Sequence, residues 1–282
     1  MTTATDAPPL GTTRWPDWTA IGAVMRKDVT AIRRAKAVVL PMLIVPILLM
    51  VVLPMLIGAA AVNQRGPDIT RLLDSLPGDL AAPILELPPE EHLVVLVLGY
   101  LLAPLFLIVP LMVSSVLAAD AFAGEKERRT LETLLHLPIT DRDLFLAKVF
   151  SSVIPAIVVS WAGFVAFAIV SNTVAWPVMG RIFVPTGLWL VMIFWVAPAV
   201  ATLGMGVMVR VSARATTTQE ANQLGGAVVL PLIFLAVGQS TGLLLLDAPF
   251  ALMVGAIIWA VALWLTARGA RRFTRDKMAA RS

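Results

Sequence analysis

The sequence predicts an all-α integral membrane protein with six transmembrane helices. Of its 282 residues, 59% are hydrophobic and only 14% are charged, and the mean hydropathy is +0.87. A soluble domain is about half apolar and about one quarter charged, so this composition excludes an ordinary soluble protein. The apolar residues run continuously instead of alternating with polar ones, which indicates helices and not strands.

Six stretches have the roughly 20 apolar residues that a helix needs to cross the hydrocarbon core. We expect spans at residues 38–62, 93–119, 149–171, 186–209, 225–246 and 249–267, all within a transmembrane domain over residues 38–267. The flanking and connecting parts are a disordered tail, an interfacial amphipathic helix, an outer acidic segment, a short loop and a basic cytoplasmic tail, at residues 1–13, 14–37, 63–92, 172–185 and 268–282. Prolines within the spans fit either flexing kinks or static packing.

Basic residues are distributed unevenly along the chain. All of the 22 Lys and Arg residues except Arg65, Arg71 and Arg181 lie before span one, between spans two and three, between spans four and five, or after span six. Cytoplasmic segments of membrane proteins carry such an excess of positive charge. We therefore expect a multi-pass protein of the cell membrane with both termini in the cytoplasm. This distribution also explains the pI near 10.0 without a nucleic-acid partner.

The segment between spans two and three is densely charged. Gly124 is expected to end the helix that leaves span two, and Pro138 to end a short helix over residues 125–137. One narrow apolar stripe follows i, i+3, i+4 spacing in that helix, at Leu131, Leu134 and Leu135. Thr140 and Asp143 form a capping-box pattern that opens the next helix. The spacing leaves two interpretations open: a helix that docks into a groove on a soluble protein, and a solvated loop without a partner.

This segment resembles the cytoplasmic signature of ABC type-2 exporter permeases. The signature has the approximate form E-[KR]-E-R-x-T-[LM]-E-x-L-L-x-x-P, followed by a lysine at the next span. This chain matches it at Glu125, Lys126, Glu127, Arg128, Thr130, Leu131, Glu132, Leu134, Leu135, Pro138 and Lys148. Arg129 and Ala147 stand where such permeases commonly have Gly. The resemblance extends to the six spans and the amphipathic N-terminal helix.

The resemblance implies the transmembrane permease subunit of an ATP-driven exporter. In such permeases the signature segment is a coupling helix that inserts into a cleft of a separate ATP-binding-cassette ATPase subunit, and two permease chains join two ATPase chains. ATP and Mg would then be bound by the partner ATPase, and this chain would bind no cofactor and would not be an enzyme. The expected ATPase contacts are Glu125, Lys126, Glu127, Arg128, Thr130, Leu131, Glu132, Thr133, Leu134, Leu135 and Pro138. The choice between a homodimer and a heterodimer of permeases stays open, as does the substrate.

The predicted N-terminal helix begins after Asp17, which can cap it. Its apolar residues recur at steps of three and four, at Trp18, Ile21, Met25, Val29 and Ile32, and its basic residues can snorkel to the membrane surface. It resembles the connecting helix of the same family, which packs near the ATPase. Secondary contacts on the ATPase side or at the membrane interface are therefore expected at Trp18, Arg26, Lys27 and Lys148. Membrane anchoring alone explains the N-terminal pattern equally well.

The segment between spans four and five contains a second capping-box pattern, at Thr217 and Glu220. Polar residues follow in the first turns of span five, and a polar inner mouth of a transport path would include Gln219, Glu220, Asn222 and Gln223. Helix capping and interface polarity explain these residues more simply, and we favour that explanation.

Several motifs are missing from the sequence. It has no G-x-x-x-x-G-K-[ST] phosphate loop, no H-E-x-x-H and no G-x-S-x-G. It has no cysteine, and His92 and His136 are too far apart in sequence to suggest a metal site. The main alternative function is an ion-coupled secondary transporter, but the spans have no Asp, Glu, Lys or Arg near their centres. A third hypothesis is a membrane scaffold without transport.

Overall fold

The computed structural model describes residues 16–34, 36–63, 84–124, 139–215, 217–226 and 248–272, together with residues 73, 82, 127 and 230. Within this part of the chain nearly all of the backbone is helical and there is no strand, which confirms the all-α prediction. Five helices are long and apolar enough to cross a membrane: Met42–Val62, Pro89–Gly124, Asp141–Met179, Gly187–Ser212 and Ala248–Arg271. They correspond to spans one, two, three, four and six. The predicted fifth span lies almost entirely outside the described residues.

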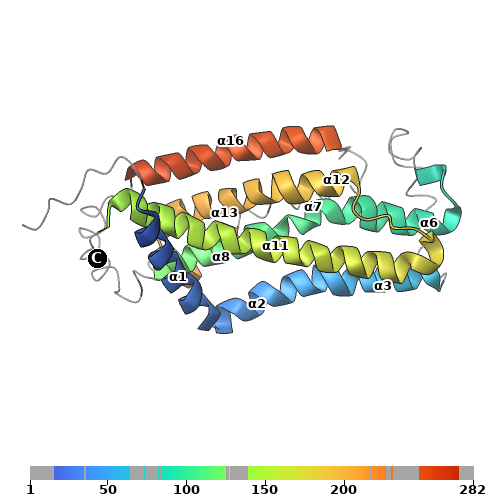
Figure 1. Cartoon of the computed structure of the whole chain (residues 1–282), viewed down its shortest axis with the longest axis horizontal. Coiled ribbons are helices and arrows are strands. Elements are labelled where there is room, and N and C mark those ends of the chain that lie inside the picture. Colours follow the sequence, from blue (N-terminus) through green and yellow to red (C-terminus); the bar gives the residue numbers. More distant parts are fainter. Residues whose placement is uncertain are drawn as a thin grey trace, which may run out of the picture.

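The chain enters the bundle through α1 (Trp18–Arg34), which crosses one end of it (Figure 1). Asp17 caps this helix, as predicted. Its Oδ1 accepts hydrogen bonds from the Thr19 N–H, the Thr19 hydroxyl and the Ala20 N–H. The hydrogen bond from the Thr19 hydroxyl is the main cause that lowers the pKa of Asp17. The first pass then runs through α2 (Lys36–Ile47), the π-helical segment η1 (Leu48–Val52) and α3 (Leu53–Val62).

The second pass returns as a series of helical segments that includes two π-helical turns. They are α6 (Pro89–Val94), η2 (Val95–Leu101), α7 (Leu102–Phe106), α8 (Ile108–Ala119) and η3 (Asp120–Gly124). The third pass is a single helix, α11 (Asp141–Met179). The fourth pass combines α12 (Gly187–Val191), η4 (Met192–Val196) and α13 (Ala197–Ser212). Two further helices follow in the described part, α14 (Thr218–Gly225) and α16 (Ala248–Arg272).

The predicted loop over residues 172–185 is wrong in its first half, because α11 continues to Met179. The helix ends where Gly180 adopts φ +58, a left-handed conformation that glycine tolerates best, and its N–H bonds to the Trp176 carbonyl. Asn172, the first residue of the predicted loop, lies inside the helix and bridges it to the loop that follows. Its side-chain amide donates to the Ala168 and Val184 carbonyls, both at 2.8 Å. The oxygen of the same amide accepts from two loop N–H groups, so this polar residue is satisfied inside the helix.

An ion pair closes the same end of the bundle. Arg181, just after α11, donates from Nη1 to Glu91 Oε1 at 3.1 Å and from Nη2 to Oε2. Glu91 lies in α6 and is buried, whereas Arg181 is half exposed. A two-point contact between guanidinium and carboxylate fixes orientation as well as distance. It therefore holds the start of the second pass against the end of the third.

The bundle core is formed by aromatic side chains from three passes. Trp189 of α12 is fully buried between Phe106 of α7 and Phe164 and Phe167 of α11, with ring centroids 4.5–5.7 Å from its own. Toward the other end, α13 lies between α8 and α16, as Figure 1 also shows. A Cβ atom on Gly204 of α13 would lie 2.6 Å from the Ser114 hydroxyl of α8, so these two helices touch closely.

In the π-helical segments η2, η3 and η4, backbone carbonyls accept hydrogen bonds from side chains of other helices. In η4 the Ala197 N–H bonds to the Met192 carbonyl, and the next donor in that register would be Pro198, which has no N–H. The Ile193 carbonyl accepts instead from the Trp161 indole N–H of α11, at 3.3 Å. Two residues further on, the Trp195 carbonyl accepts from the Trp259 indole of α16, at 3.1 Å.

The two π-helical segments of the second pass, η2 and η3, show the same arrangement. The Leu98 carbonyl of η2 accepts from the Trp189 indole N–H at 3.1 Å, and the Ala121 carbonyl of η3 accepts from Lys148 Nζ. Hydrocarbon offers no donors, so backbone groups in a membrane need partners inside the protein. Side chains of other passes supply such partners at these two segments.

We predict that Gly58→Ala lowers the melting temperature of the purified protein. A Cβ on Gly58 would lie 2.7 Å from Val174 Cγ1 and 3.1 Å from Val174 Cβ, and this β-branched side chain of α11 cannot swing away freely. Overpacking costs about 1–3 kcal/mol, which exceeds the roughly 1 kcal/mol that Ala gains over Gly in a helix. Gly22→Ala is the control, because nothing lies within 4 Å of its Cβ position. Equal melting temperatures for both variants in detergent would contradict the close contact of α3 and α11.

Candidate functional site at one end of the bundle

The charged signature segment is anchored at both ends in the same end of the bundle. Before it, η3 ends at Gly124; after it, α11 begins with Thr140 as its cap. The cap confirms the predicted pattern, because the Asp143 N–H donates to Thr140 Oγ1 at 3.1 Å and the Thr140 hydroxyl donates to the Asp143 carboxylate at 2.8 Å. Of the predicted helix only Glu127 is described. Outside the described residues lie Glu125, Lys126, Arg128, Thr130, Leu131, Glu132, Thr133, Leu134, Leu135 and Pro138.

Glu127 connects this segment to α14. Its Oε2 accepts hydrogen bonds from the Thr218 N–H and the Thr218 hydroxyl, both at 2.9 Å. Thr217 caps the same helix by accepting the Glu220 N–H at 3.1 Å, as its sequence pattern predicts. A carboxylate at the first turn of a helix also complements the positive end of the helix dipole. The start of the charged segment and the start of α14 are therefore joined at two points.

The residues predicted as a polar inner mouth lie on α14, which packs against α13, α8 and η3. Gln219 and Gln223 are exposed, and Glu220 and Asn222 are half buried. Ala221 and Gly225 are the buried residues of this helix, and Ala221 belongs to an apolar cluster of the bundle. The capping hydrogen bond accounts for part of this polarity, and a role in a transport path stays a prediction.

Lys148 lies inside the protein and not on its surface. It is 1% exposed, and its Nζ donates to the Ala121 carbonyl of η3 and lies 5.4 Å from the centroid of the Phe122 ring. The hydroxyls of Ser151 and Ser152 in turn donate to the Lys148 carbonyl, each at 3.0 Å. The signature lysine thus fixes the last turn of span two to the first part of span three. Its predicted contact with an ATPase would need this buried position to open.

Helix α1 packs across α11 at this end. Its buried residues are Ile21, Val24, Asp28 and Ile32, so the predicted stripe is turned slightly and Met25 and Val29 are only half buried. Trp18 is 64% exposed and stacks on Phe150 of α11, with 6.2 Å between the ring centroids.

Asp28 accepts a hydrogen bond from Ser151 at 3.4 Å and lies 3.3 Å from Lys27 Nζ. Sequence analysis missed Asp28, although an acidic residue inside an apolar stripe was the available signal.

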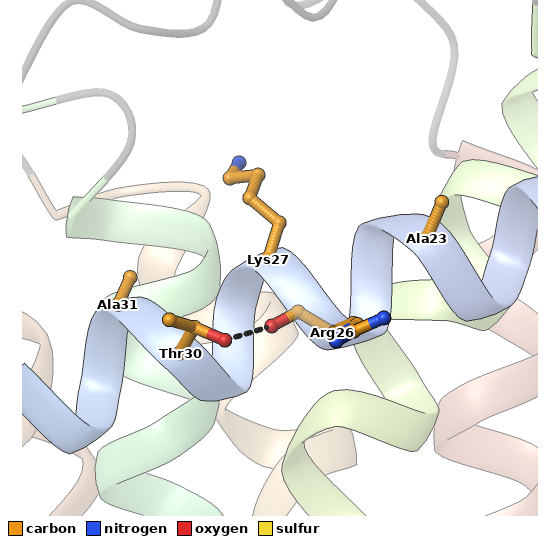
Figure 2. A pocket seen from close by; sticks show the side chains of 5 residues that line it. All are labelled: Ala23, Arg26, Lys27, Thr30 and Ala31. Atoms are coloured by element: carbon orange, nitrogen blue, oxygen red, sulfur yellow. Dashed lines mark hydrogen bonds between the residues drawn. The ribbon is translucent and has the colours of Figure 1, made fainter.

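The outer face of α1 carries the predicted basic residues. Arg26 and Lys27 are exposed there and line an open hollow of about 570 Å³ together with Ala23, Thr30 and Ala31 (Figure 2). The Thr30 hydroxyl donates to the Arg26 carbonyl at 2.7 Å, which keeps it occupied by its own helix. This face is therefore cationic and accessible from the side, and a secondary contact there stays a prediction.

The buried charged residues of the described part are Asp28, Glu91, Asp143 and Lys148. Asp28 belongs to α1, Glu91 opens the second pass, and Asp143 and Lys148 lie in the first third of α11. None of them lies at the middle of a candidate span, where proton relays and ion sites place their ionisable groups. Among the described residues no three His, Asp or Glu side chains come together as a metal site would require.

Comparison with known proteins identifies the family. A family model described as ABC-2 family transporter protein matches residues 22–252, which is most of the chain. The chain therefore belongs to this family, and it is a membrane permease of an ABC-type transporter. Proteins of this family generally work with an ATPase partner. A comparison with curated proteins gave no match.

We predict that Lys148→Met lowers the melting temperature in detergent. The substitution keeps the apolar stem and removes the donor that satisfies the buried Ala121 carbonyl, and an orphaned buried acceptor costs about 1–3 kcal/mol. Arg142→Met is the matched control, because Arg142 lies on the same helix and is exposed. If both variants melt with the wild type, Lys148 does not hold η3 to α11.

Proposed function

We propose that this chain is the transmembrane permease subunit of an ATP-driven exporter. Residues 125–137 form its coupling helix, through which a separate ATPase subunit drives the transport cycle. The observation that carries the proposal is the long signature segment between spans two and three in a chain of the ABC-2 family. The hydrogen bonds from Thr218 to Glu127 support the proposal, because a movement of this segment would displace α14 directly.

ATP and Mg bind to the partner ATPase in this proposal, and the permease itself binds no nucleotide. The 282 residues contain no phosphate-loop motif, which supports this division, since backbone amides in such a loop cradle the phosphates. The second permease subunit is either a second copy of this chain or a related one. Substrates enter from the surrounding membrane and are apolar or amphipathic, because the spans offer few fixed charges.

We further propose six spans with both termini and the signature segment in the cytoplasm. The excess of Lys and Arg on one side supports this orientation. The directions of two helices support the predicted fifth span, which brings the number of spans to six. The Trp195 indole N–H of η4 donates to the Leu252 carbonyl near the start of α16, and Arg210 of α13 lies beside Trp264 near the end of α16, so the fourth pass and α16 are parallel neighbours. Two parallel spans need a crossing of the membrane between them, which residues 225–246 are apolar enough to supply.

An ion-coupled secondary transporter is the less favoured alternative. Such a protein needs ionisable groups near the middle of the membrane, and the buried charged residues of the described part lie elsewhere.

The coupling helix is tested with Leu134→Asp combined with Glu132→Arg. We expect a permease that inserts and folds but loses complex formation with its ATPase and loses transport, because charges enter the apolar contact. Leu85→Asp is the control: Leu85 is an exposed leucine four residues before α6, and α6 lies at the end of the bundle opposite α1 (Figure 1). Wild-type complex formation and transport by the double variant would sink the proposed coupling helix.

The orientation is tested by labelling single cysteines, since the natural chain has none. Lys126→Cys should be protected from an impermeant maleimide in intact cells and react after lysis, whereas Asp79→Cys should react in both. The reverse pattern would overturn the topology.

A further inference from the structure

Two arginines from different spans share one tryptophan ring. The guanidinium carbon of Arg210 on α13 lies 4.7 Å from the centroid of the Trp264 ring on α16, and that of Arg268 lies 5.3 Å from the same centroid. The two guanidinium groups are therefore at most about 10 Å apart. Trp264 is 54% exposed and Arg268 is exposed, so the group is accessible from outside the bundle.

No carboxylate of the described residues forms a salt bridge with either of these arginines. Two positive charges at this separation repel each other, because the distance is comparable with the screening length, which is about 8 Å at physiological salt. The ring offers each cation some attraction, roughly 0.5–1 kcal/mol at exposed sites, but it adds no negative charge. An anion between or beside the guanidinium groups would remove the repulsion, and guanidinium binds phosphate oxygens through two parallel hydrogen bonds.

The position of Arg210, Trp264 and Arg268 along their helices indicates that such an anion would come from the lipid headgroups. The candidate spans end at Ser212 and Arg271, so Arg210 and Arg268 both lie in the last turns of membrane-crossing helices. Arginine in the last turn of a span reaches the lipid headgroups, and tryptophan is enriched at the same interface, where Trp264 lies one turn before Arg268. Exposed apolar residues of α16 continue from Trp264 toward the middle of the span at steps of three and four, at Val261, Ile257 and Met253.

We propose that Arg210, Trp264 and Arg268 form a binding site for the phosphate of an anionic phospholipid, whose acyl chain lies along Val261 and Ile257 of α16. The cationic end supplies the headgroup contact, and the exposed apolar stripe supplies a surface that a free phosphate would not use. The site joins α13 to α16 on the side that carries the excess of basic residues. It is independent of the ATPase partner and of the coupling helix.

The experiment measures lipid binding by the full-length chain in phosphatidylcholine nanodiscs. Increasing fractions of phosphatidylglycerol should raise the melting temperature along a saturable curve. A basic residue near an anionic surface is worth about fivefold in affinity, so Arg210→Gln with Arg268→Gln should raise the half-saturating fraction about thirtyfold. Trp264→Leu keeps both charges and should weaken binding less, by loss of the shared ring. If the double variant does not fold, the half-saturating fraction is measured for Arg268→Gln alone, whose position is exposed.

The matched control is Arg214→Gln with Arg271→Gln. Both arginines are exposed at the same end of the bundle, and neither stacks on a described ring, so the control removes equal charge without touching the site. It should keep the wild-type curve within about twofold. Three results would each overturn the proposal: no saturable shift in the wild type, equal weakening in both double variants, or the same shift with inorganic phosphate in pure phosphatidylcholine. The second would indicate a diffuse surface charge, and the third a site for a free anion.

Discussion

Every backbone carbonyl in a membrane needs a donor from the protein, and this constraint explains much of the packing of the bundle. The second and fourth passes contain π-helical segments, whose wider turns disturb the regular ladder of hydrogen bonds. The donors come from other helices: indole N–H groups reach η2 and η4, and an ammonium group reaches η3. A tryptophan can do this because it is large and apolar and still carries one N–H. Irregular backbone thereby fixes which helices are neighbours.

The same constraint gives the signature lysine a structural meaning. A signature that runs from residue 125 to Lys148 suggests one continuous surface for a partner, yet Lys148 is buried and holds the Ala121 carbonyl. Charge in an apolar interior is costly, so a lysine there is favoured only by the groups that it contacts. The signature therefore has two parts with different chemistry. One is a charged segment outside the spans, and the other is the buried Lys148 of α11, which binds η3 just before that segment begins.

Sequence analysis succeeded where the physical cause is local. The caps at Asp17, Thr140 and Thr217 depend on a side chain and an N–H two or three residues away, and the structure has all three. The outlines of the spans are equally local, because continuous apolar sequence suffices. The end of α11 was misplaced because Asn172 is satisfied by loop residues eleven and twelve positions further on, which no local pattern reveals. The burial of Asp28 and Lys148 depends on contacts between separate passes and was equally out of reach.

The end of the bundle with the signature segment is joined by polar contacts that cross between passes. Asp28 accepts from Ser151 on α11, Lys148 reaches η3, and Glu127 accepts from Thr218 on α14. Apolar contacts between helices can slide, but hydrogen bonds to a defined atom fix the position along the helix axis. A force applied to the charged segment would therefore act on α14 through Glu127 and on spans two and three through Lys148. In the proposed function, these contacts would pass a movement of the short segment on to several helices, which a permease driven by a separate ATPase requires.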